Sequence, residues 1–404
     1  MGSAVGQVLR NRQFVWFLGS WATASTGYSV FAISVVWLAL DVSRNFLIVG
    51  AVLAIERAAY CATFLVAPLA DRVRNQRTIF LASFPVQAVL AAVLGYAAVH
   101  GVLSVVELLG LVAVLSVLWD LSWAAANAAP GILLTPDDQF AAAGVEGLVG
   151  GVNSIAGFAA GGALILVVGA GGGMYLYAAL LVTATALAGP LRISPPRGER
   201  QSFLASLHAG WRTLAGGRGR PLLQLAAVDT VQGFFSAAPV VLLTLVAVRV
   251  FAGAPADYAT LFVCYIVGGV VAGLLFARWN PRGRVGGLVV GSLLVGGGAL
   301  ALVGWVPGVL ALASAVWLAV GFTQSAYQDA KYAFLRGSVP AGELARVVSN
   351  LYTFPGVASV AGAAAVGAVA GGVSGATLAL TLAAGMAGAG VLAAVLPGVR
   401  SLRF

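Results

Sequence analysis

Long apolar runs separated by short polar turns dominate the hydropathy pattern of this 404-residue chain. A bilayer core about 30 Å thick is crossed by roughly 20 helical residues, so each run is long enough to form a transmembrane helix. The pattern predicts twelve such helices. They cover residues 14–40, 46–70, 78–99, 102–126, 141–168, 173–191, 222–247, 258–277, 285–305, 308–328, 347–370 and 375–396.

One connection is much longer than the others. Residues 192–221 contain Pro195-Pro196, Gly216-Gly217 and six arginines. This composition predicts a cytoplasmic linker between two six-helix halves, residues 1–191 and 222–404. Residues 203–212 within it also have an amphipathic pattern that would suit a helix lying on the membrane surface.

Two landmarks recur at nearly the same offset along the chain. The charged turn beginning at Ala67 has a counterpart beginning at Gly273, 206 residues later. The turns containing Pro136 and Pro340 are 204 residues apart. A fixed offset at two independent places indicates two halves with the same architecture, although chance recurrence of arginine-rich turns is the alternative.

The charged turn resembles the loop between helices 2 and 3 of major facilitator transporters, which reads G-x-L-A-D-R-x-G-R-[RK]. Leu69, Ala70, Asp71 and Arg72 match this pattern. Ala67 and Arg74 stand at the two glycine positions. The resemblance implies twelve helices in two halves that rock about a central site, with spans 1, 4, 7 and 10 lining the cavity.

Within that superfamily, the chain is most similar to the branch that exports drugs and siderophores, of the macrolide and enterobactin type. The similarity is carried by residues 11–19, by residues 135–143 and by residues 156–162. The last stretch resembles the G-P-x-x-G-G sequence of exporters, with Phe158 where proline is expected. The glycines alone would also suit close helix packing.

Composition supports an all-α integral membrane protein, because 60% of residues are hydrophobic and 9% are charged, whereas soluble domains have about 25% charged residues. The 53 glycines suit tight packing of helices in lipid, as in Gly157-x-x-x-Gly161 and Gly269-x-x-x-Gly273. Cys61 and the second cysteine, Cys264, have no metal-binding or redox spacing. We expect no metal site and no cofactor.

The charged loops orient the helices. With both termini in the cytoplasm, nineteen Lys and Arg residues fall on the cytoplasmic side and two, Arg44 and Arg249, fall outside, as the positive-inside rule requires. This predicts a multi-pass protein of the cell membrane, plasma or inner. The net charge of +9 follows from this topology, so we expect no nucleic-acid partner. We expect a monomer.

Ionisable side chains within the spans are the main functional candidates, because each costs at least a few kcal/mol in hydrocarbon. Glu56 lies about 15 Å from the outer end of its span, near the bilayer midplane, where a desolvated carboxylate binds protons more readily. Arg57 points about 100° away around the helix and would pair with Asp120 or Glu146. The proton-coupling candidates are therefore Glu56, Arg57 and Glu146. A fixed ion pair that locks two helices is the alternative.

Aromatic and polar side chains near the intramembrane acids predict a cavity for an amphipathic, cationic substrate. For Trp119, Trp123 and Tyr327, an aromatic belt at the membrane interface is an equal alternative. The cavity candidates are Tyr28, Trp119, Asp120, Trp123, Asp229, Gln232, Phe235, Gln324 and Tyr327.

The resemblance implies a cytoplasmic gate in which Asp71 holds the outward-open state. The gating candidates at span ends are Asp71, Arg72, Arg278, Asp329 and Lys331. Because Ala277 stands where the second half would carry the matching acid, gating is expected to be asymmetric.

These features favour proton-coupled export of an amphipathic small molecule. An importer, a lipid or metal-ion carrier and a non-transporting membrane protein are the alternatives. An enzyme is not expected, because the chain has no H-E-x-x-H sequence or other convergent catalytic set. A G-x-x-x-x-G-K-[ST] nucleotide-binding sequence is also absent.

Overall fold

The computed structural model describes residues 2–61, 75–135, 138–193, 220–236, 238–251, 255–279, 285–305, 308–338 and 341–400. Regular secondary structure in these ranges is helical, and ten of the helices are long and apolar enough to cross a membrane. The predicted all-α membrane fold is confirmed. The count of twelve spans stays a prediction, because several predicted spans extend beyond the described ranges.

The chain forms two compact units. Unit 1 comprises residues 1–44 and 62–199, and unit 2 comprises residues 45–61 and 200–404. The segment 45–61 belongs to unit 2, whereas the predicted first half would include it. Most of the predicted linker, 192–221, lies outside the described residues, as do Asp71 and Arg72 of the predicted gate.

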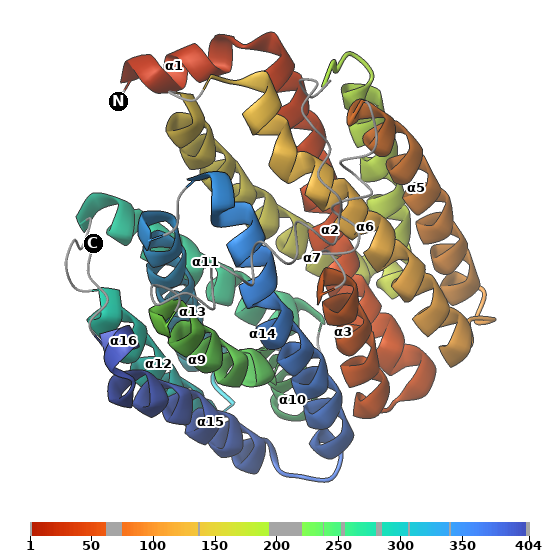
Figure 1. The fold of residues 1–404 in the computed structure, drawn as a ribbon. Helices are drawn as coiled ribbons and strands as arrows, with labels where there is room; N and C mark the ends of the chain where they lie inside the picture. Colours follow the sequence, from red (N-terminus) through yellow and green to blue (C-terminus); the bar gives the residue numbers. More distant parts are fainter. Residues whose placement is uncertain are drawn as a thin grey trace. The chain divides into compact units, whose positions relative to one another are not determined.

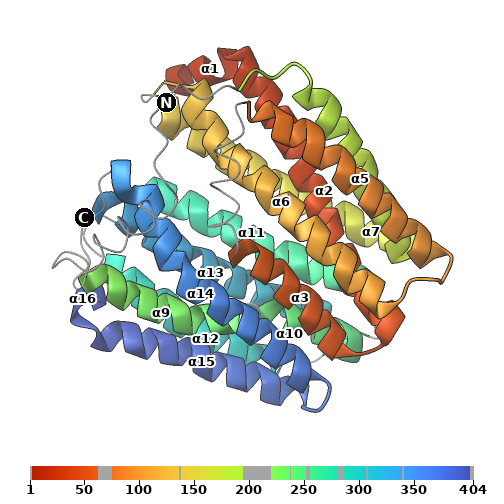
Figure 2. The same cartoon turned by 45° about the vertical axis from the view of Figure 1, so that its right-hand side comes forward.

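Unit 1 is a bundle of long helices. A short helix, α1 (Gly2–Arg10), contacts α2 and α7 at one end of it. The long helices lie side by side (Figures 1 and 2): α2 (Arg12–Ser43), α5 (Arg77–Val99), α6 (Val105–Leu133) and α7 (Gln139–Ala188).

Two of these helices begin at side-chain caps. The Asn11 side chain accepts hydrogen bonds from the backbone N–H groups of Gln13 and Phe14 at the start of α2. At the start of α6, the hydroxyl of Ser104 and the carboxylate of Glu107 form a reciprocal capping box. Such caps satisfy backbone donors that the first turn of a helix leaves unpaired.

Helix α7 is broken at Gly169, which has φ 75° and ψ 174°. Glycine reaches this backbone conformation readily because it has no Cβ atom. The break divides α7 into two segments that correspond to the predicted spans 141–168 and 173–191.

Close packing of α7 on α2 depends on small residues. A Cβ atom at Gly157 would lie 2.5 Å from the carbonyl oxygen of Thr26, and one at Gly161 would lie 2.7 Å from Cγ2 of Ile33. Only glycine permits such an approach. The predicted role of this Gly-x-x-x-Gly pair in helix packing is confirmed.

Unit 2 contains the remaining helices. Within it, α3 packs along α14, α11 along α13, α12 against α13 and α15, and α9 against α14 and α15. Its helices are α3 (Phe46–Cys61), α9 (Arg220–Ser236), α10 (Ala238–Val250), α11 (Pro255–Trp279), α12 (Val285–Val303), α13 (Leu310–Ser338), α14 (Ala341–Ala370), α15 (Gly375–Val395) and α16 (Pro397–Arg400).

Glycines also mark the closest helix contacts of unit 2. A Cβ atom at Gly50 of α3 would lie 2.5 Å from Cα of Gly367 in α14. On α11, a Cβ atom at Gly269 would lie 2.5 Å from Oγ of Ser325, whereas one at Gly273 would meet only an atom 3.9 Å away. The predicted pair on α11 is therefore tight at its first member only.

Residues 329–346, which lie between two predicted spans, are mostly helical. Helix α13 continues to Ser338 and α14 begins at Ala341. A helix of 29 residues is about 44 Å long at 1.5 Å per residue, so it can extend well beyond the hydrocarbon core. Polar residues near its end therefore indicate the end of the apolar span and not the end of the helix.

Candidate functional site

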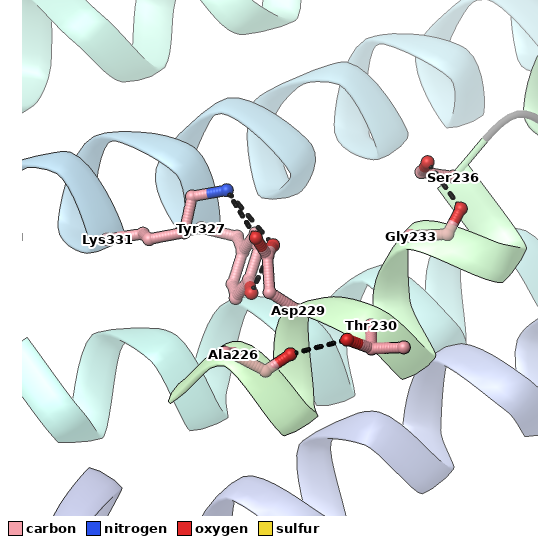
Figure 3. Close-up of polar contacts among 7 residues, drawn as sticks. All are labelled: Ala226, Asp229, Thr230, Gly233, Ser236, Tyr327 and Lys331. Carbon is pink, nitrogen blue, oxygen red and sulfur yellow. Dashed lines mark hydrogen bonds and ion pairs between the residues drawn. The ribbon is translucent and has the colours of Figure 1, made fainter. Parts of the chain in front are cut away.

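Unit 2 contains a buried ion pair between α9 and α13. The Nζ atom of Lys331 donates to both carboxylate oxygens of Asp229 at 3.0 Å each, and the hydroxyl of Tyr327 donates to Oδ1 at 2.8 Å (Figure 3). The exposed fractions of the Lys331 and Asp229 side chains are 3% and 8%. This is a charged site shielded from water.

The helical spacing explains how α13 contributes two groups to this site. Tyr327 and Lys331 are four residues apart, so they lie on the same face of the helix. The Nζ atom of Lys331 is also 5.5 Å from the ring centroid of Tyr327 and 5.6 Å from that of Tyr332. Both rings are within the range of cation–π attraction.

Other polar side chains on α9 differ in their hydrogen bonding. The hydroxyl of Thr230 donates to the carbonyl of Ala226, and that of Ser236 donates to the carbonyl of Gly233 (Figure 3). By contrast, Nε2 of Gln232 is buried with no hydrogen-bond partner in the described part of the chain. Among these groups, Nε2 of Gln232 is the donor without a described partner.

The pairing of Asp229 with Lys331 differs from the separate roles predicted for them, a substrate contact for Asp229 and a gating residue for Lys331. Asp229 was expected to attract a cationic substrate, but its charge is already balanced by Lys331. Lys331 was expected at a water-facing gate, but it is 2% exposed. The structure thus brings together two cavity candidates, Asp229 and Tyr327, and one gating candidate, Lys331.

Unit 1 contains a stack of aromatic rings between α2 and α6. The Trp119 ring stacks on that of Tyr28, with centroids 4.1 Å apart and planes inclined by 7°, and on that of Trp21, at 5.1 Å and 18°. Trp119 is 8% exposed, so an interfacial belt does not describe it. Trp21 was not among the predicted site residues, although its spacing of seven from Tyr28 places both on one face of α2.

Helix α6 also carries a buried carboxylate. Asp120 follows Trp119 in the sequence and is 5% exposed, and its Oδ2 atom has no hydrogen-bond partner among the described residues. On α7, Oε1 of Glu146 is also buried without a partner in the same ranges. An acid that is buried without a described partner is the type of group that holds a cation or a proton.

Glu56 and Arg57 of α3 lie near two tyrosines of α11. The carboxylate of Glu56 acts electrostatically on Tyr258, whose hydroxyl is hydrogen-bonded to Thr244, and Arg57 acts on Tyr265. The predicted pairing of Arg57 with Asp120 or Glu146 would join the two units, and it stays a prediction.

Sequence reasoning missed a buried polar network in unit 1. The side chain of Gln87 donates to Ser83 at 2.8 Å and accepts from the hydroxyl of Tyr177 at 3.0 Å, while Ser83 and Ser122 are 2.8 Å apart. The available signal was the spacing of four between Ser83 and Gln87 in an apolar span. The network links α5, α6 and α7.

The remaining candidates are less directly engaged. The ring of Phe235 lies against Gly385 of α15, so it contributes to helix packing. Gln324 is half-buried on the face of α13 that carries Tyr327. Trp123 is half-buried, and Asp329 is half-buried facing Gly273. The side chain of Arg278 lies outside the described residues.

The sequence matches no family model and no curated protein. Solved structures are similar along nearly the whole chain. The nucleoside transporter NupG has a TM-score of 0.69 and 12% identity, covering 95% of this chain and 98% of its own. A POT family transporter in complex with 5-aminolevulinic acid has a TM-score of 0.71 and 11% identity, covering 95% of both chains.

The human organic anion transporter MFSD10 has a TM-score of 0.67 and 16% identity, covering 95% of this chain and 99% of its own. At these identities, the similarity concerns the fold. The chain is therefore a multi-pass membrane protein with the fold of the major facilitator transporters.

Proposed function

We propose that this protein is a secondary active transporter that exports an amphipathic small molecule across the cell membrane, driven by protons. The proposal includes a monomer with both termini in the cytoplasm and an alternating-access cycle. It is supported by the fold, which the chain shares with transporters of nucleosides and organic anions. The substrates of those proteins are their own, so the substrate class has to come from this chain's residues.

The observation that carries the proposal is the buried carboxylate of Asp120, which follows Trp119 on α6, together with the stacking of the Trp119 ring on those of Trp21 and Tyr28. Transferring an ionised carboxylate out of water is costly unless the group is paired or protonated. A substrate with a cationic group and an aromatic body would neutralise the carboxylate and contact the rings. Trp123 of the same helix is proposed as a further contact, and Gln232 and Gln324 stay predicted cavity residues of unit 2.

Glu56 is proposed as the proton-coupling carboxylate. Its span has no other acid, and Tyr258 and Thr244 provide polar surroundings for it in unit 2. Arg57, the next residue on α3, is proposed to adjust its affinity for protons through its charge. Glu146 stays a proton-coupling candidate of unit 1. The gate is proposed to use Asp71, Arg72, Arg278 and Asp329 at span ends, as the sequence resemblance implies.

A second candidate function is favoured by the Asp229–Lys331 pair. The buried Lys331 cation would attract an anionic substrate that takes over from Asp229 as its counter-charge. This exchange of partners suits uptake of an anion.

Thermal stability of the purified full-length protein distinguishes these functions, because a ligand that binds the folded state raises the melting temperature. The probes are ethidium and related aromatic cations, and 1-naphthalenesulfonate and related aromatic anions, each at pH 6 and pH 8. Export of cations predicts stabilisation by ethidium that is larger at pH 8 and lost in Asp120→Asn. Uptake of anions predicts stabilisation by the sulfonate that is lost in Lys331→Met. Stabilisation by neither class would contradict both functions.

A further inference from the structure

Four arginines lie at or next to the helix ends at the end of unit 1 where α2 and α5 begin and α7 ends. We propose that this basic rim, consisting of Arg10, Arg12, Arg77 and Arg192, binds the headgroup of an anionic phospholipid. The site is separate from the transport residues, and the proposal does not depend on the transported substrate.

The elbow between α1 and α2 is held in a fixed geometry. Asn11 caps α2, and its side-chain nitrogen donates to the carbonyl of Leu133 at the end of α6 at 2.9 Å. Val8 of α1 is fully buried. The elbow therefore places Arg10 and Arg12 on either side of a residue that is anchored to the bundle.

The segment following α7 is clamped between the first residues of α2 and α5. Oε1 of Gln13 accepts from the backbone N–H of Arg192 at 2.7 Å, and the backbone N–H of Gln76 donates to the carbonyl of Ile193 at 3.0 Å. Arg12 and Arg77 are each one residue from these contacts, and neighbouring Cα atoms are about 3.8 Å apart. The three helix ends thus bring Arg12, Arg77 and Arg192 close together.

The charge of the rim is poorly balanced within the described residues. Arg10, Arg12 and Arg192 are exposed, and no ion pair joins any of them to another described residue. The Nε atom of Arg77 is buried with no described hydrogen-bond partner. The described carboxylate at this end, Asp138, accepts a hydrogen bond from Thr135 at 2.8 Å. Guanidinium groups in this arrangement suit a phosphate group.

Two features favour a lipid over a free anion. Leu9 and Val15 are 46% and 44% exposed beside the arginines, so apolar surface adjoins the charged groups. In addition, α2 has 32 residues and is about 48 Å long, so one end reaches the headgroup region of a bilayer with a core of about 30 Å. A phosphate with attached acyl chains would contact both the arginines and the apolar surface beside them.

Binding of phosphatidylglycerol to the delipidated full-length protein tests the proposal, with phosphatidylcholine as the zwitterionic comparison. Retained lipid is counted by native mass spectrometry, and the melting temperature is measured alongside it. Each arginine near a membrane surface contributes about fivefold in affinity for anionic lipid. The double variant Arg12→Gln/Arg192→Gln should therefore bind phosphatidylglycerol about 25-fold more weakly. The matched control is Arg44→Gln, which changes an exposed arginine at the other end of α2 and should leave binding unchanged.

Equal retention of both lipids by the unaltered protein would overturn the proposal, as would unchanged phosphatidylglycerol binding in the double variant. Inorganic phosphate is tested separately. If phosphate alone raises the melting temperature as much as the lipid does, the site binds anions in general and the lipid proposal is wrong. If the double variant does not fold, Arg10→Gln and Arg12→Gln serve singly, each with an expected fivefold loss.

Discussion

Removal of Lys331 from its pair with Asp229 should destabilise unit 2 strongly. Lys331→Met retains most of the side-chain volume but leaves the Asp229 carboxylate, which is 8% exposed, without its cation. Breaking a buried ion pair by removing one partner costs about 3–5 kcal/mol, because the remaining charge is uncompensated. Asp229→Asn should cost a similar amount for the opposite charge. Tyr327→Phe removes one hydrogen bond to a charged acceptor, which costs about 1.5–3 kcal/mol.

The double variant Asp229→Asn/Lys331→Met distinguishes pairing from separate effects. Because no unpaired charge remains, it should be more stable than either single variant by about 3 kcal/mol. The free energy of unfolding is measured in mixed micelles by the same denaturant series for all variants. Asp41→Asn, at an exposed position near the end of α2, is the matched control and should change stability by less than about 0.5 kcal/mol. Additive costs in the double variant would refute the pairing.

Three further changes test other parts of the structure. Asp120→Asn should weaken ethidium binding by about 1.5–3 kcal/mol, because a charge-assisted contact is lost. The affinity is measured by isothermal titration at pH 8, and an unchanged value would rule out the carboxylate as a contact. Gly157→Ala should cost about 1–3 kcal/mol of unfolding free energy, because α2 leaves no room for a Cβ atom. Its control is Gly147→Ala on the same helix, where a Cβ atom meets nothing within 4 Å; this variant should be neutral or stabilising. Gln87→Leu removes the acceptor of the Tyr177 hydroxyl and the donor to Ser83 and should cost about 1–3 kcal/mol. Val86→Leu, at a position 48% exposed, should cost little. Equal costs would show that the network adds no stability.

Much of the fold could be predicted from hydropathy, because a bilayer imposes both the length and the apolar character of each span. The predicted break between residues 168 and 173 coincides with Gly169, and the glycines at 157 and 161 contact another helix. Such features depend on local sequence. They are therefore visible before any tertiary contact is known.

The pairing of side chains from distant helices could not be predicted. Asp229 and Lys331 are 102 residues apart, and nothing in the periodicity of either helix indicates which faces meet. Lys331 was assigned to a water-facing end because charged residues usually mark one, but here a carboxylate on another helix stabilises it in the interior. The network of Ser83, Gln87 and Tyr177 was missed for a related reason, since uncharged polar residues hardly change the hydropathy of a span.

The most direct test of proton-driven transport uses Glu56→Gln in sealed proteoliposomes. The probe is whichever aromatic cation or anion stabilises the unaltered protein most, beginning with ethidium. For this protein, we expect the probe to accumulate when a pH gradient is imposed and to leave when an ionophore collapses that gradient. The Glu56→Gln protein should still exchange the probe down its concentration gradient but should not accumulate it. Accumulation by Glu56→Gln at the unaltered rate would contradict the coupling role of Glu56, and flux no faster than in protein-free liposomes under any gradient would contradict transport itself.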